Sequence, residues 1–232
     1  MNGDRRPARL AGLLYLCLTI AGIFTLVIVP GRTIVAGDAA ATAAKILGSE
    51  SLYRAGIAVS IFNSFLFLLL AVALYRLFME VNASLAKLMV MLVLVQVPMA
   101  VGDAMNQLAA LLLLKGEPYL AVFDAAQKNA LAMLFLQING QGTIASELFW
   151  GLWLVPLAIL VYRSGFLPRF LGIYLAVNAL AYVALCAVGL LWPQHFAFAN
   201  RYSFPALMGE PAFTLWLLVM GAKPRLAIST KA

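Results

Sequence analysis

Residues Gly140–Arg169 read GQGTIASELFWGLWLVPLAILVYRSGFLPR. This stretch decides the fold class, because an apolar run long enough to cross a bilayer ends in a basic Arg163-Ser-Gly turn that is closed by Pro168. One acid, Glu147, lies inside the run. A charged side chain at the bilayer centre costs about 2.5–3.5 kcal/mol on insertion scales, so such a side chain normally faces protein or water. We therefore expect a transmembrane helix whose carboxylate has a partner on another helix.

The composition of the whole chain supports a membrane protein. Of its 232 residues, 64% are hydrophobic and 11% are charged, and the mean hydropathy is +0.97. Soluble domains are closer to half apolar and one quarter charged. The chain is therefore predicted to be an all-α polytopic membrane protein that forms one transmembrane domain over residues 1–232. The net charge of +7 resides mainly at the ends of the apolar segments, where it indicates orientation and anionic lipid headgroups rather than nucleic acid.

Windows of about 20 apolar residues predict six transmembrane helices in one bundle. The predicted spans cover residues 10–29, 55–79, 88–114, 143–162, 167–191 and 204–220. Residues 130–161 would form a helix of about 48 Å, too long for one crossing. We therefore expect a break at Asn139-Gly-Gln-Gly142, preceded by a surface or re-entrant helix over residues 120–138. Residues 194–203 are expected to be a loop, and Glu210-Pro211 interrupts the sixth span, which alternatively begins at Pro211.

The distribution of basic residues predicts that both termini are cytoplasmic, because Lys and Arg favour that side. The tail before the first span, the two tight loops and the C-terminus carry ten: Arg5, Arg6, Arg9, Arg76, Lys87, Arg163, Arg169, Lys223, Arg225 and Lys231. The opposite side carries six: Arg32, Lys45, Arg54, Lys115, Lys128 and Arg201. The first apolar run, about 20 residues long, indicates an uncleaved span rather than a signal peptide. Asp38 is expected to cap a short helix in the loop that follows.

Polar side chains on four predicted spans fall in one layer of the outer half of the membrane. Counting about 1.5 Å per residue from the cytoplasmic helix ends places them at similar depths. The four residues are Asn63, Asp103, Glu147 and Tyr182. Asn106 and Gln107 extend the layer, since they lie three and four residues after Asp103 on its helix face. Arg54, at the outer end of the second span, is the basic residue positioned to reach the layer from above.

Two interpretations of this layer remain open. Intramembrane amide and acid groups often hydrogen-bond helices together, each contributing about 0.6–2 kcal/mol. Alternatively, Asp103 and Glu147 form a site for a small ligand, a proton or a cation, because two neighbouring carboxylates at low dielectric cannot both stay ionised without a counter-charge.

Other motifs carry less chemistry. His195 is the only histidine and has no Cys, Asp or Glu at metal-ligand spacing, so no metal site is predicted. Cys17 and Cys186 lie in apolar runs and are expected to be small buried side chains. Ser146 and Ser164 lack the context of a nucleophile, and no phosphate-binding loop or cofactor motif occurs, so we assign no catalytic residue and no cofactor.

An ordered set of short segments resembles a bacterial family of multi-pass membrane proteins known as domain of unknown function, number 4386. The segments are RLAGLLYL, GDAAATAAKIL, LYRAGI, FWGLWLVPL and RSGFLPRFLG, and they extend from Arg9 to about Pro193. The resemblance implies a six-helix protein of the bacterial cytoplasmic (inner) membrane. It brings no established activity and no functional residues.

Three functions follow from these observations. The first is a membrane protein that binds or transports a small ligand, proton or cation in the outer-half acidic layer. The alternative is a structural or accessory subunit of a larger membrane complex, in which the layer serves helix packing. An intramembrane enzyme has the least support, because no nucleophile or metal set accompanies the acids. The lipid bilayer is the expected partner, nucleic acid is not, and the sequence leaves homo- and hetero-oligomers open.

Overall fold

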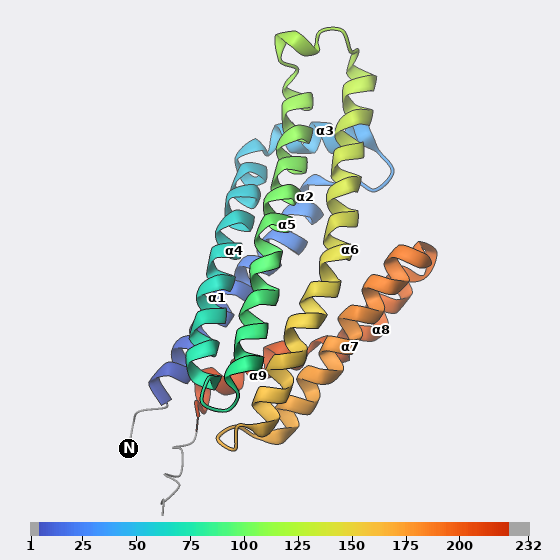
Figure 1. Ribbon diagram of the computed structural model, residues 1–232. Helices are drawn as coiled ribbons and strands as arrows, with labels where there is room; N and C mark the ends of the chain where they lie inside the picture. Colours follow the sequence, from blue (N-terminus) through green and yellow to red (C-terminus); the bar gives the residue numbers. More distant parts are fainter. Residues whose placement is uncertain (1–4, 223–232) are drawn as a thin grey trace, which may run out of the picture. The chain divides into compact units, whose positions relative to one another are not determined.

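The computed structural model describes residues 5–222, and the regular structure in this range is entirely helical (Figure 1). Within residues 5–222, five helices or joined helices are long and apolar enough to cross a membrane. They cover Arg6–Thr33, Glu50–Phe78, Ala83–Lys115, Ala125–Arg163 and Arg169–Leu191. The predicted all-helical, multi-pass class is therefore confirmed. Three residues used for the orientation, Lys223, Arg225 and Lys231, lie outside the described range.

The first apolar segment continues past the predicted end at Pro30-Gly31. It consists of α1 (Arg5–Ile23), the π-helix η1 (Phe24–Ile28) and α2 (Val29–Thr33). Pro30 has no amide hydrogen and its ring crowds the carbonyl four residues earlier. The wider π turn accommodates this, with the amide of Val29 bonded to the carbonyl of Phe24, five residues back. The proline thus changes the type of helix without ending it.

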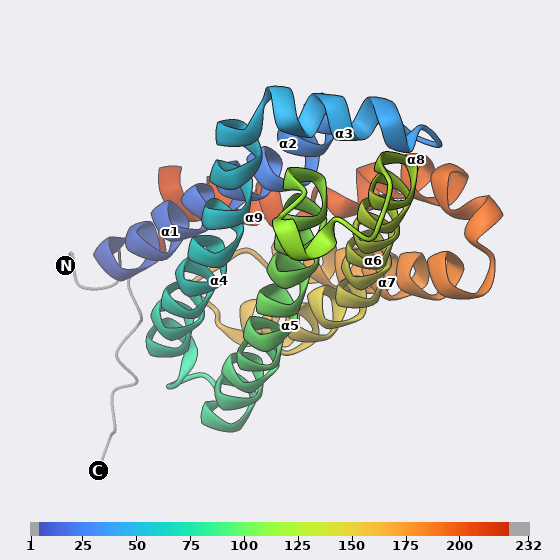
Figure 2. The same ribbon diagram turned by 90° about the horizontal axis from the view of Figure 1, so that it is seen from above.

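The short helix predicted after Asp38 is confirmed as α3 (Ala39–Gly48). The Asp38 carboxylate accepts a 2.8 Å hydrogen bond from the amide of Ala41 and so satisfies one free donor of the first turn. This helix lies across the direction of α4 and α5 rather than along it (Figures 1 and 2).

The second and third predicted spans correspond to α4 (Glu50–Phe78) and α5 (Ala83–Lys115), each several residues longer than expected at one end or both. A short turn joins them. In this turn the side chain of Asn82 accepts a 3.0 Å hydrogen bond from the amide of Leu85 and caps α5.

The expected break at Asn139–Gly142 is wrong. After the 3-10 turn η2 (Pro118–Leu120), α6 runs without interruption from Ala125 to Arg163, 39 residues, so neither a separate helix over 120–138 nor a span starting at residue 143 exists. Side chains stabilise the glycine-containing segment. Asn139 donates to the backbone carbonyl of Asp103, and the hydroxyls of Thr143 and Ser146 bond carbonyls one turn earlier. Tertiary contacts of this kind override the weak helix propensity of glycine.

The C-terminal part also differs from expectation. After α7 (Arg169–Leu191) and the short turn η3 (Pro193–His195), residues expected as a loop form α8 (Phe196–Leu207). A second helix, α9 (Gly209–Val219), follows directly. The sixth span predicted over 204–220 is therefore two short helices, neither of them long enough to cross a membrane alone.

The chain divides into two compact units. Unit 1 contains residues 1–17, 67–94 and 147–232, and unit 2 contains residues 18–66 and 95–146. Four helices, α1, α4, α5 and α6, contribute residues to both.

Unit 2 has a core of small and branched apolar side chains from five helices. Its buried residues are Val29, Ile46, Tyr53, Ile57, Ala104, Ala110, Leu111, Leu113, Ala132 and Leu136.

The core of unit 1 is held by aromatic side chains and close helix contacts. Trp153 packs edge-on against Phe67, and Tyr15 contacts both Trp153 and Phe213. Gly172 lets α7 approach α6, because a Cβ at this position would lie 2.8 Å from the carbonyl oxygen of Ala158 and from the amide of Tyr162. Such small-residue contacts are a common means of packing helices in membranes.

Candidate functional site

The break between α8 and α9 lies directly against α7, and this arrangement positions the acid Glu210. A Cβ on Gly209 would lie 2.9 Å from the carbonyl oxygen of Tyr174 in α7, so the backbones touch here. At the break the carbonyl of Pro205 accepts only a long 3.4 Å bond from the amide of Met208, and the amide of Glu210 lies in the first turn of the new helix. Tyr174 donates its hydroxyl to this carbonyl over 2.6 Å, and the side-chain oxygen of Asn178 accepts from the amide of Glu210 over 3.0 Å. Side chains of α7 therefore stabilise the interrupted helix.

The carboxylate of Glu210 is the centre of a cluster in unit 1. Glu210 lies in the first turn of α9, where the helix dipole favours a negative charge. The hydroxyl of the buried Tyr15, from α1, donates to it. The hydroxyl of Tyr182, from α7, donates as well. Two donors from two helices compensate the cost of removing a carboxylate from water.

Glu147, the acid in the apolar part of α6, lies near Tyr182. Only 8% of its surface is exposed, and its Oε2 atom has no hydrogen-bond partner among residues 5–222. It interacts electrostatically with Tyr182 and with Cys186, both on α7. One turn later on α6, Trp150 meets the ring of Tyr182 edge-on with centroids 5.7 Å apart. Tyr182 thus lies within the electrostatic field of two carboxyl groups, and it is hydrogen-bonded to one of them.

Two further polar atoms of unit 1 are buried without a partner in the described part of the chain. They are Nδ2 of Asn178 and Oγ1 of Thr214. Asn178 lies four residues before Tyr182 on α7, and Thr214 lies four residues after Glu210 on α9, so each shares a helix face with a member of the cluster. We define the carboxylate–tyrosine cluster as Tyr15, Glu147, Asn178, Tyr182, Glu210 and Thr214. Its uncompensated polar atoms set the cluster apart, because native structures rarely leave such atoms unpaired.

The other residues of the predicted layer belong to unit 2, where Asp103 has its own contacts. Its backbone carbonyl accepts a 3.2 Å hydrogen bond from Nδ2 of Asn139. Its carboxylate lies against Gly142 so closely that a Cβ there would be in steric conflict with Oδ1. The glycine that was expected to break α6 therefore makes room for Asp103. Glu147 and Asp103 belong to different units, and their pairing stays a prediction.

The remaining predicted site residues have local roles in unit 2. Oδ1 of Asn63 is buried and unpartnered within the described residues, and Asn106 is partly buried on α5. Gln107 accepts, through its backbone carbonyl, a 3.1 Å hydrogen bond from the hydroxyl of Tyr53. Arg54 pairs with Glu50 at 2.7 Å, and Lys115 reaches the same carboxylate at 3.3 Å. The charge of Arg54 is therefore directed at Glu50, in an exposed network of small energetic weight.

The chemistry available to the cluster is that of proton and cation binding. No group of three or more His, Cys, Asp or Glu that could hold a metal ion occurs between residues 5 and 222. Carboxyl and phenol groups joined by hydrogen bonds can hold and pass a proton. A carboxyl oxygen without a donor, such as Oε2 of Glu147, is stabilised when it binds a proton or a small cation.

The layer predicted from the sequence includes Glu147 and Tyr182 of this cluster but not Tyr15, Asn178, Glu210 and Thr214. The signal for Glu210 was present, since an acid between apolar runs is the same feature that drew attention to Glu147. It was interpreted only as an interruption of the sixth span. Tyr15 carried no signal, because a tyrosine in an apolar run is typical of helix packing.

Comparison with known families places the chain in a family of unknown function. The family described as Domain of unknown function (DUF4386) matches the chain over residues 10–221. No curated protein and no solved structure gives a significant match.

Proposed function

The chain belongs to the DUF4386 family, domains of unknown function, and we propose that it is an integral membrane protein that binds an exchangeable proton in the carboxylate–tyrosine cluster. The observation that carries this proposal is the different environment of two acids around one tyrosine. Glu210 accepts from the hydroxyls of Tyr15 and Tyr182, whereas Oε2 of the buried Glu147 has no donor among residues 5–222.

The asymmetry between the two acids assigns their roles. Two hydroxyl donors stabilise the ionised form of Glu210. A bound proton removes the cost of a buried negative charge on Glu147. Tyr182 lies near both carboxyl groups, so its hydroxyl is placed to relay a proton between them. A small monovalent cation that competes with this proton for Glu147 would make cation binding and proton release depend on each other.

Placement in the membrane is part of the proposal. In this proposal the five long apolar helices each cross the membrane once and the α8–α9 pair crosses it a sixth time. An even number of crossings places both termini on the same side of the membrane. The excess of Lys and Arg at the α4–α5 and α6–α7 turns and in the N-terminal tail supports a cytoplasmic location for that side. A bacterial inner membrane fits this arrangement. Labelling of single cysteines at positions 80 and 121 with a membrane-impermeant reagent in intact cells tests it, since only position 121 should react.

Interrupted helices support a binding role, because broken transmembrane helices place freed backbone groups and helix ends at the sites of many transporters. The α8–α9 break has this property, with Glu210 in the first turn after it.

Infrared difference spectroscopy on the purified chain tests the proposal. A pH step should produce a band of a protonated carboxyl group that shifts in deuterium oxide. Glu147→Gln should remove this band and Tyr182→Phe should shift it. Glu117→Gln, which changes a carboxylate in the loop before α6, is the matched control and should leave it unchanged. Sodium added at constant pH should diminish the band if the cation competes with the proton. A spectrum in which Glu147→Gln has no effect contradicts the proposal.

A scaffolding role is the second candidate, and one observation favours it. The contacts of Glu210 join α1, α7 and α9, as expected of a residue that holds helices together. In that case Glu147→Gln and Glu210→Gln would lower thermal stability while the infrared band of the wild-type chain would be absent.

A further inference from the structure

The α4–α5 and α6–α7 hairpins of unit 1 share an arrangement of residues that lies outside the carboxylate–tyrosine cluster. The first helix of each hairpin carries a Tyr-Arg pair in its last turn, Tyr75-Arg76 in α4 and Tyr162-Arg163 in α6. A basic residue follows in the first turns of the next helix, Lys87 in α5 and Arg169 in α7. All four cationic side chains are exposed.

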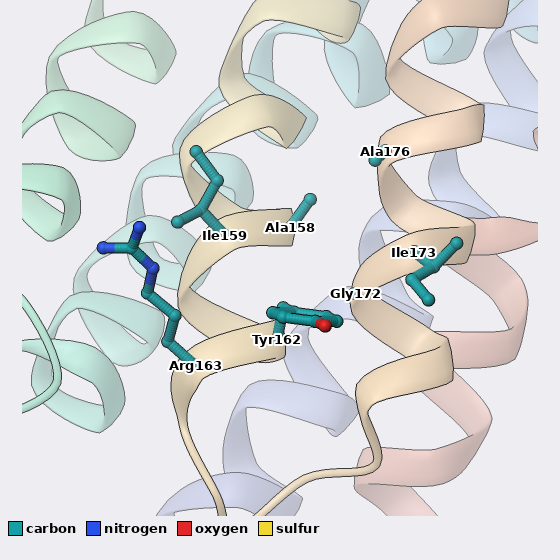
Figure 3. A pocket seen from close by; sticks show the side chains of 7 residues that line it. All are labelled: Ala158, Ile159, Tyr162, Arg163, Gly172, Ile173 and Ala176. Atoms are coloured by element: carbon teal, nitrogen blue, oxygen red, sulfur yellow. The ribbon is translucent and has the colours of Figure 1, made fainter.

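A groove of about 290 Å³ lies between α6 and α7 beside this pair. Its lining residues are Ala158, Ile159, Tyr162, Arg163, Gly172, Ile173 and Ala176. Figure 3 shows the ring of Tyr162 reaching from α6 toward α7, with Ile159 and Ile173 farther from the hairpin turn and Arg163 extending along α6. The groove exists because Ala158, Gly172 and Ala176 have small side chains. Its apolar walls suit part of a hydrocarbon chain rather than a polar solute.

A cationic group lies beside the aromatic ring of this groove, at the start of α7. The guanidinium of Arg169, the first residue of α7, lies 5.6 Å from the centroid of the Tyr162 ring. The guanidinium of Arg163 is instead turned away from the hairpin turn, along α6 (Figure 3). Neither Arg163 nor Arg169 forms an ion pair with an acid in the part of the chain that the structure describes. Along α7 the order from Ala176 to Arg169 is therefore an apolar wall and then the arginine beside the tyrosine ring.

The α4–α5 hairpin has a groove with similar types of side chain. This second groove, of about 390 Å³, is lined by Val72, Tyr75, Lys87, Val90 and Met91. Val72, Val90 and Met91 lie farther along the helices from the turn than Tyr75 and Lys87 do. Each of the two grooves thus combines apolar side chains with one tyrosine and one basic side chain, which indicates a common ligand.

We propose that these two grooves bind anionic phospholipids, each with an acyl chain along the apolar wall and the phosphate at the cations. In the groove between α6 and α7 the order of groups along α7 matches that in a phospholipid, from hydrocarbon to the charged headgroup. Arginine binds phosphate with paired donors and tyrosine prefers the membrane interface. The apolar walls make no favourable contact with free inorganic phosphate, whereas they can bind an acyl chain. The proposed ligand is therefore the lipid. The inference is independent of the proton site.

Native mass spectrometry of the detergent-purified full chain tests the proposal with two probes, dioleoylphosphatidylglycerol and dioleoylphosphatidylcholine. The wild-type chain should retain more of the anionic lipid. Arg163→Gln combined with Arg169→Gln should weaken its retention by about fivefold for each arginine removed, the equivalent of about 1 kcal/mol per basic residue near a membrane surface. Arg76→Gln combined with Lys87→Gln should have a similar effect through the other groove.

Matched variants separate the groove from general charge. Arg201→Gln removes an exposed arginine of α8 and should leave retention unchanged. Arg163→Lys with Arg169→Lys keeps the charge and should keep most of the binding. Ala176→Phe fills the apolar wall and should reduce retention of both lipids. Equal retention of the two lipids by the wild-type chain, or equal loss in the Arg201 and the double glutamine variants, overturns the proposal.

Discussion

The amide of Glu210 donates a 3.0 Å hydrogen bond to Oδ1 of Asn178, and this bond connects the first turn of α9 to the middle of α7. It satisfies a backbone donor that the α8–α9 break would otherwise leave free. Asn178 is fully buried, so water does not replace it as a partner. The relationship between these two residues holds the acid of the cluster at a fixed place on α7.

Replacement of Asn178 by alanine should lower the free energy of unfolding by about 1–3 kcal/mol, because the amide of Glu210 loses its acceptor inside the protein. Titration with sodium dodecyl sulfate, followed by tryptophan fluorescence, measures this change. Asn200→Ala, at an exposed position of α8, is the control and should be close to neutral. Equal effects of the two substitutions would show that the bond contributes nothing.

Tyr15→Phe should cost about 1.5–3 kcal/mol in unfolding free energy, the usual contribution of a hydrogen bond to a charged group. The phenol ring remains packed against Trp153 and Phe213, so the effect comes from the hydroxyl alone. In a Glu210→Gln background the same substitution should cost less, about 0.5–1.5 kcal/mol, because the acceptor is neutral. A double-mutant cycle without coupling energy would exclude the Tyr15–Glu210 bond.

Gly172→Ala should destabilise the chain by about 1–3 kcal/mol, since the added methyl group meets the α6 backbone and α6 and α7 must separate. The new Cβ would lie 2.8 Å from the carbonyl oxygen of Ala158. Gly102→Ala is the matched change on α5, where nothing lies within 4 Å of the new Cβ. It should instead stabilise the helix by roughly 0.5–1 kcal/mol. Thermal unfolding monitored by circular dichroism compares them, and the opposite order of stabilities would contradict the close α6–α7 contact.

Gly142→Ala should destabilise unit 2 by displacing the carboxylate of Asp103, which lies against this glycine. In an Asp103→Ala background the obstacle is gone, so the same change should become neutral or slightly stabilising, as expected of alanine in a helix. Gly140→Ala, with no atom within 4 Å of the new Cβ, should be insensitive to the residue at position 103. The four unfolding free energies of each cycle provide the comparison. If the effects of Gly142→Ala and Asp103→Ala on the unfolding free energy were additive, the Asp103 carboxylate would not lie against Gly142.

Local features of the fold were predictable from the sequence. The apolar segments of α4, α5 and α7 follow from hydropathy, which sums the transfer free energies of neighbouring residues and needs no knowledge of the partner helices. The cap of α3 by Asp38 is equally local, because the side chain bonds an amide three residues away. Glu147 and Tyr182 were identified from their polar character within apolar runs.

The continuity of α6 and the position of the helix break were not predictable in this way. The Asn139–Gly142 segment reads as a turn, yet it stays helical because Asn139 bonds to Asp103 and Gly142 gives Asp103 room. Glu210-Pro211 indicated an interruption of the sixth span, but its exact place, at Met208, depends on Tyr174 and Asn178, which bond the backbone groups on either side of it. Whether a helix continues or ends at such points depends on partners that are distant in sequence.

Hydropathy and residue spacing were therefore enough to predict the membrane class, most helical segments and one of the two acids of the cluster. These depend on properties of consecutive residues. The folded chain was needed to show that Glu210 accepts hydrogen bonds from Tyr15 and Tyr182, whereas helix depths counted along the sequence had already placed Glu147 and Tyr182 in one layer. The physical reason is that a buried carboxylate is stabilised by whichever donors the packing of other helices brings to it, and residue spacing along one helix does not contain that information.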